Sequence, residues 1–173
     1  MSERISIEEL ESYLWNSAVL LRSSIDAGAY KQYIFPLLFF KRICDVYDEE
    51  TAAAVEEYGT DVVDFDEDEL HTFIVPKGYH WKDVREVSEN VGSAILNAFQ
   101  AIEKANIEQL HGVFGDGAWT NKNRLPDALL KDLLEHTVQL FNICFFNCLK
   151  CVQNSASNIL RNFAYIFPMI MQR

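Results

Sequence analysis

The chain has 173 residues, of which 49% are hydrophobic and 13% aromatic. This length and composition allow one domain with its own core and exclude a generally disordered chain. The net charge of −11 argues against a general nucleic-acid coat, because binding along phosphates requires clustered Lys and Arg. A local basic patch remains compatible with this charge.

The first residues predict a cytoplasmic chain that begins with an amphipathic helix. The opening stretch, MSERISIEELESYL, carries acids where a secretory signal would carry an apolar run. No segment reaches the roughly 18 uninterrupted apolar residues of a membrane span. Ser6 and Glu9 have capping-box spacing, and apolar residues follow at intervals of three and four, so we expect a helix over residues 6–22 and a turn over residues 23–28.

A second helix, apolar over most of its circumference, is predicted from Ala29 onward, with Pro36 in its interior. Proline removes a backbone donor and crowds the carbonyl of Gln32, which costs about 3 kcal/mol in a regular helix interior. Either the helix kinks at Pro36, which we favour, or one helix ends near Phe35 and another begins with Pro36 in its first turn. We expect residues 30–50 to form the central helix of the fold.

The rest of the chain predicts further helices joined by polar loops. We expect a solvated acidic segment over residues 61–69 and a turn at Pro76 and Gly78. A third long helix should follow from about Val84 to Ala105, and a glycine-rich loop should begin at His111. The next helix should begin at Pro126 or Asp127 and face the core with Leu129, Leu130, Leu133 and Leu134. No stretch alternates apolar and polar residues for long. The predicted fold is therefore all-α, a compact multi-helix bundle with a kinked central helix and at most a short β-hairpin.

Two short segments combine aromatic, amide and basic side chains. Such a combination can meet a phosphate backbone or a polar partner surface, whereas the simpler interpretation packs each Trp on the core and leaves the bases for solubility. The candidate DNA or partner contacts are Trp81, Lys82, Arg85, Trp119, Asn121, Lys122 and Arg124.

Other patterns give no catalytic, cofactor-binding or metal residue. The GDG sequence at residues 115–117 lacks the flanking strand and helix of a phosphate loop. Cys144, Cys148 and Cys151 share one helical face, but zinc needs four ligands, so buried thiols are favoured over a small metal protein. The four histidines are spread along the chain without a recognisable nucleophile.

Three long blocks, over residues 14–50, 73–106 and 110–136, closely resemble in order the N-terminal helical domain of the DNA modification subunit of type I restriction-modification systems. The resemblance covers about residues 8–136. It implies an adenine-N6 methyltransferase that uses S-adenosylmethionine and works with a specificity subunit and a second modification subunit. In that family the helical domain precedes the catalytic domain, helps to enclose DNA and contacts partners.

The chain departs from that family in two respects. It contains neither a DPACGSG-like cofactor motif nor NPP followed by an aromatic residue, so we expect it to bind no cofactor and, alone, not to methylate DNA. Residues 1–136 hold all 26 acids against 12 Lys and Arg, a net charge of −14, whereas residues 137–173 hold no acid. We therefore expect a helical domain over 1–136 and an atypical tail over 137–173, packed as helix on the domain or on a second copy.

These observations leave two functions open. The first is a truncated modification subunit whose helical domain serves assembly and DNA enclosure. The alternative is a free-standing interaction or regulatory protein that dimerises, through the tail for example, or docks on a complete modification subunit. Neither interpretation involves a membrane.

Overall fold

The computed structural model of the chain describes residues 12, 15–17, 19–22, 24–59 and 70–148, with backbone alone from residue 139 onward. Every regular element within these residues is a helix. The elements are η1 (Ala27–Ala29), α2 (Lys31–Tyr58), α4 (Trp81–Glu86), α5 (Val91–Ala105), α6 (Ile107–Leu110) and α7 (Asp127–Cys148). The predicted all-α fold is confirmed for the described part of the chain.

The helix predicted over residues 6–22 is described only in part. Residues 12, 15–17 and 19–21 are helical, and the other positions lie outside the described residues. Leu21 is fully buried, whereas Trp15 and Val19 are exposed, so one face of this segment packs on the core and another carries exposed apolar side chains. The predicted acidic segment over residues 61–69 also lies outside the described residues.

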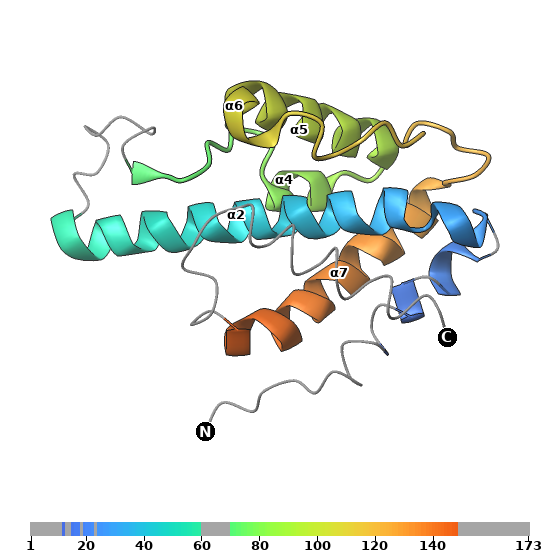
Figure 1. Cartoon of the computed structure of the whole chain (residues 1–173), viewed down its shortest axis with the longest axis horizontal. Helices are drawn as coiled ribbons and strands as arrows, with labels where there is room; N and C mark the ends of the chain where they lie inside the picture. Colours follow the sequence, from blue (N-terminus) through green and yellow to red (C-terminus); the bar gives the residue numbers. More distant parts are fainter. Residues whose placement is uncertain (1–11, 13–14, 18, 23, 60–69, 149–173) are drawn as a thin grey trace.

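The central element is α2, which Figure 1 shows as one helix along most of the molecule. Pro36 is the sixth residue of this 28-residue helix, so the helix does not end near Phe35. The helix continues to Tyr58, beyond the predicted stretch, and its apolar face supplies the fully buried side chains of Leu37, Phe40 and Cys44. Burial of this face against other helices compensates for the hydrogen bond that proline removes.

The third long helix predicted from Val84 to Ala105 is wrong, because the structure divides this segment into α4 and α5. The backbone of Val87 is extended, and Asn90 adopts a left-handed conformation with φ 57°. The carboxylate of Asp127 then accepts hydrogen bonds from the N–H groups of Asn90 and Val91, at 3.1 and 2.8 Å. Valines at helical spacing gave no sign of this break, since its cause lies 36 residues away in the chain.

The core lies between α2, α5 and α7 and is rich in aromatic rings. Phe99 of α5 stacks on Phe114 with ring centroids 4.4 Å apart and meets the edges of Phe40 and Trp119 at 5.6 and 5.4 Å. The predicted inward face of α7 is confirmed, since Leu130, Leu133 and Leu134 are buried and Leu129 packs at the edge of the core. Helix α7 begins at Asp127 as predicted.

Helices α2, α5 and α7 all begin at the same end of the bundle, on the right in Figure 1. The bonds from Asn90 and Val91 to Asp127 join the starts of α5 and α7 there. Helix α7 passes residue 136 without a break and continues to Cys148, so the predicted domain boundary falls inside a helix. Residues 149–173 of the predicted tail lie outside the described residues.

Candidate functional site

The two candidate tryptophans lie in the core, where the simpler interpretation of the sequence places them. Trp81 is 4% exposed and packs on Phe40 with ring centroids 5.1 Å apart, and Trp119 is 1% exposed and meets the ring of Tyr33 at 5.2 Å. Aromatic rings of this size remove a large apolar area from water, so burial is their favourable position. Neither ring reaches a surface that a DNA strand or a partner could stack on.

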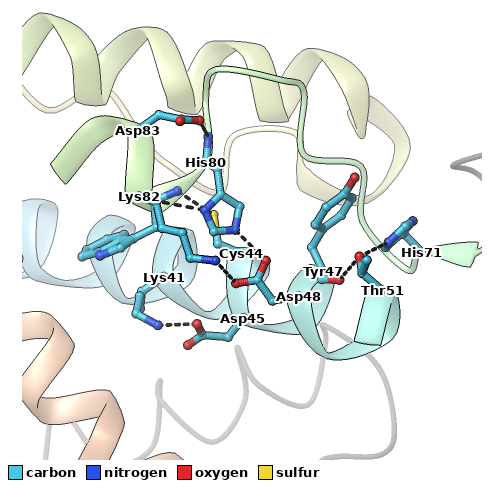
Figure 2. Close-up of polar contacts among 11 residues, drawn as sticks. Lys41, Cys44, Asp45, Tyr47, Asp48, Thr51, His71, His80, Lys82 and Asp83 are labelled. Atoms are coloured by element: carbon cyan, nitrogen blue, oxygen red, sulfur yellow. Dashed lines mark hydrogen bonds and ion pairs between the residues drawn. The ribbon is translucent and has the colours of Figure 1, made fainter. Parts of the chain in front are cut away.

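A cluster of polar contacts holds α4 on α2, as Figure 2 shows. The backbone N–H of Trp81 donates to the Sγ atom of Cys44 at 3.3 Å. Burial raises the pKa of the Cys44 thiol to about 12, so this sulfur stays protonated and acts as a structural acceptor. His80 caps the start of α4 with two hydrogen bonds. Its ring Nδ1 atom accepts from the backbone N–H of Lys82 at 3.2 Å, and its backbone N–H donates to the carboxylate of Asp83 at 3.0 Å.

The same cluster engages Lys82, one of the candidate contact residues. Its ammonium group lies 3.0 Å from Asp48 of α2, and the Nε2 atom of His80 lies 3.2 Å from the other oxygen of that carboxylate (Figure 2). The Lys82 side chain is 72% exposed, so an ion pair of this kind adds little stability and breaks readily. Lys82 remains accessible to an anionic partner, although Asp48 partly offsets its charge.

Arg85, the third candidate on α4, is engaged by α7. Its guanidinium group donates to both carboxylate oxygens of Glu135, at 2.5 and 2.6 Å. Hydrogen bonding to Arg85 lowers the pKa of Glu135, and the same pairing raises the pKa of Arg85. Both side chains are about half exposed, so the ion pair adds little stability. Its bidentate geometry nevertheless defines the relative orientation of the two side chains. Arg85 therefore fixes α4 relative to α7, which is a simpler role than phosphate contact.

The remaining candidates occupy the later part of the loop over residues 111–126, which lies at the end of the bundle where the three long helices begin. Asn121, Lys122 and Arg124 are all exposed. The Asn121 side chain accepts from the N–H of Asn123 at 3.2 Å, which shapes the turn, and Lys122 lies 3.5 Å from Asp127. Of the four basic candidates, Arg124 alone has no ion pair with a described residue.

Two glycines allow this loop to contact α2 and α5 closely, because a larger residue at either position would clash. Gly92 of α5 lies against the backbone of Trp119, and a Cβ atom placed on it would fall 2.0 Å from the Trp119 carbonyl oxygen. On the other side, Gly117 lies against the start of α2, where the Gln32 carbonyl oxygen is 3.3 Å from the equivalent Cβ position. The exposed bases thus project from a segment that the starts of α2 and α5 enclose.

The family model described as HsdM N-terminal domain matches residues 10–137. The chain belongs to this family. The match spans the three blocks of the sequence resemblance and identifies the segment as the N-terminal domain of a type I restriction-modification M subunit. No curated protein matches the chain.

The sequence did not indicate three carboxylates of this HsdM N-terminal domain that form ion pairs with basic candidate residues. Asp48 pairs with Lys82, Glu135 with Arg85, and Asp127 with Lys122. Burial alone would raise the pKa of Asp127, but the N–H groups of Val91 and Asn90, together with Lys122, lower it more. Two of the three pairs join residues 34 and 50 positions apart, so no local pattern could have indicated them.

The HsdM N-terminal domain shows no cluster of three or more potential metal ligands within its described residues. In the same part of the chain, no helix combines the length and apolar character needed to cross a membrane. The side chains of Cys144, Cys148 and Cys151 lie outside the described set, so the interpretation of these residues as buried thiols stays a prediction.

Proposed function

We propose that this domain serves subunit assembly and DNA enclosure in a type I modification enzyme, an adenine-N6 methyltransferase with S-adenosylmethionine as its methyl donor. The chain supplies no cofactor site in this proposal, and other parts of a complete cytoplasmic enzyme supply catalysis. The expected partners are a specificity subunit, a second modification subunit and, through the whole complex, DNA. Membership of the HsdM N-terminal domain family supports the proposal.

The single observation that carries the DNA part is the exposed basic loop at the shared start of three helices. Lys122 and Arg124 project there from a chain whose net charge is −11. The start of α2 has no side-chain cap and no acid in its first turn, so its unpaired N–H groups carry a partial positive charge that favours nearby phosphates. Lys31, the first residue of α2, adds an exposed ammonium group at the same end of the bundle. A phosphate backbone approaching the start of α2 would therefore meet the positive charges of Lys31, Lys122 and Arg124, of which Asp127 offsets the charge of Lys122.

Fluorescence anisotropy with a labelled DNA duplex tests this proposal on the full chain. We expect weak binding that falls as salt rises, because counterion release drives phosphate contacts. A double variant, Lys122→Ala with Arg124→Ala, should lower the slope of log affinity against log salt by roughly 2, about 1 for each lost phosphate contact. The matched control removes two exposed lysines at other places, Lys77→Ala with Lys104→Ala. Equal losses from both double variants would defeat the DNA assignment.

A docking role independent of DNA is the second candidate, and one surface feature favours it. Trp15 and Val19, four residues apart on one helical face, are 50% and 44% exposed. The guanidinium group of Arg22 lies over the Trp15 ring, 5.5 Å from its centroid. Trp and Arg are, with Tyr, the residues enriched at the energetic centres of protein interfaces. Light scattering of the full chain and of a Trp15→Ser variant tests this role, since self-association through this face should weaken in the variant.

A further inference from the structure

The indole N–H of Trp119 is a buried donor without an acceptor. Its Nε1 atom is inaccessible to water and has no hydrogen-bond partner in the described part of the chain. A buried donor left unpaired destabilises the folded state, and the N–H of a buried Trp usually finds a partner. Movement that brought an acceptor to this N–H would therefore be favoured.

An acceptor lies close by, because Pro36 leaves the carbonyl of Gln32 without its regular donor. In an α-helix that carbonyl would accept from the N–H of residue 36, which proline lacks. The Gln32 oxygen lies 3.3 Å from the position where Gly117 would carry a Cβ atom, and the Trp119 Nε1 atom lies 2.9 Å from that same point. Donor and acceptor thus border one small gap, and Gly117 keeps this gap clear because it has no side chain.

We propose that Trp119 is a positioning residue whose indole N–H donates to the Gln32 carbonyl that Pro36 frees. The N–H is not in hydrogen-bonding geometry with any described atom, so the pairing requires the loop to shift relative to α2. The bond fixes residues 117–119 on the first turns of α2 and thereby sets the direction in which Lys122 and Arg124 leave the bundle. This last step rests on the proposed DNA contact, whereas the bond itself does not.

The proposal also explains why a proline is accepted inside the central helix. Pro36 is buried, and replacing it with alanine would restore an N–H that competes for the Gln32 carbonyl. The helix would gain a hydrogen bond, and the bond from Trp119 would weaken because the Gln32 oxygen would then be shared between two donors. The two substitutions Pro36→Ala and Trp119→Phe therefore weaken or remove the same contact from opposite sides.

A double-mutant cycle on the full chain tests the bond, with the folding equilibrium constant from urea unfolding as the readout. Trp119→Phe keeps a ring and removes the N–H. We expect it to lower the folding constant about two- to tenfold more in the wild-type background than in the Pro36→Ala background. Trp81→Phe is the matched control, because the Trp81 Nε1 atom is also buried and unpaired but lies on α4. Its effect should be equal in both backgrounds, and an equal effect of Trp119→Phe would overturn the bond.

Two further measurements separate the bond from the proposed function. The first is the NMR resonance of the Trp119 indole proton, which the Trp15→Phe and Trp81→Phe variants assign. This resonance should shift in the Pro36→Ala variant, and the measurement does not depend on the folding of Trp119→Phe. An unchanged resonance would count against the pairing. DNA affinity should fall in Pro36→Ala but not in Trp81→Phe. A coupled cycle with unchanged affinity would refute the positioning role alone, and loss of all DNA binding in the wild type would refute the proposed function while leaving the bond intact.

Discussion

Substitution of Gly92 by alanine should destabilise the domain, although the same change stabilises most helices. Alanine in place of glycine normally gains up to about 1 kcal/mol in a helix. At this position the new Cβ atom would lie 2.0 Å from the carbonyl oxygen of Trp119, 2.9 Å from its carbonyl carbon and 3.3 Å from the Cδ1 atom of Leu130. The obstacle is mainly backbone, which cannot rotate away as a flexible side chain would.

The structure sets the size of the expected loss. A close contact between carbon and a carbonyl oxygen is about 3.3 Å, so the loop at Trp119 must retreat from α5 by about 1.3 Å. Overpacking of this kind costs about 1 to 3 kcal/mol, and we take the upper end because backbone has to move. After the helix gain is subtracted, the free energy of unfolding should fall by about 2 kcal/mol. For a domain of this size the melting temperature should fall by roughly 6 to 8 °C.

Thermal and urea unfolding followed by far-UV circular dichroism measures this change. Gly28→Ala is the matched control, since a Cβ atom there would meet no atom within 4 Å and Gly28 has no left-handed backbone. This control should leave stability unchanged or slightly increased. A Gly92→Ala variant as stable as the wild type would contradict the close approach of the Trp119 backbone to α5.

Three further predictions concern buried or partly buried polar groups. Asn106→Ala should lower the free energy of unfolding by roughly 2 to 4 kcal/mol in a urea titration, because the Asn106 amide pairs with both backbone groups of Ile74 at 2.8 Å and would leave them unpaired. Asp127→Asn should flatten the acid limb of a stability-against-pH profile. The pKa of Asp127 is lower in the folded state than its unfolded pKa of 3.8. Its contribution to folding stability is therefore complete above pH 3.8 and is lost as the pH falls through the lower, folded-state pKa. In a full chain that keeps Cys44 as its sole cysteine, a maleimide should label the thiol only as fast as the protein unfolds, because burial raises the pKa of Cys44 to about 12; rapid labelling of folded protein would contradict this.

The sequence predicted the helical class and the central position of α2 because both depend on the spacing of apolar residues. That spacing reports which face of a helix is buried, so the inward leucines of α7 and the burial of Leu37 and Phe40 followed from it. The same signal failed between Val84 and Val91. Valines at helical intervals line the core on both sides of a break, and the group that stabilises the break, Asp127, comes much later in the chain.

The candidate site was harder to predict because local composition does not show burial. Trp119 and Arg124 are five residues apart, yet one ring is in the core and the other side chain is exposed. The sequence offered both interpretations of each Trp, and the choice between them depends on contacts with α2 and α5. The carboxylate partners of Lys82 and Arg85 were likewise beyond local reasoning, since they come from other helices.

The cap that residue 127 places on α5 has a consequence for biosynthesis. While the polypeptide is still emerging from the ribosome, the amides of Asn90 and Val91 have only water to pair with until 36 more residues have been added. By then nearly the whole family segment, which ends at residue 137, has been made. Completion of the second long helix is thereby linked to the arrival of the last one, so a nascent chain interrupted before that point would carry an unfinished start of α5.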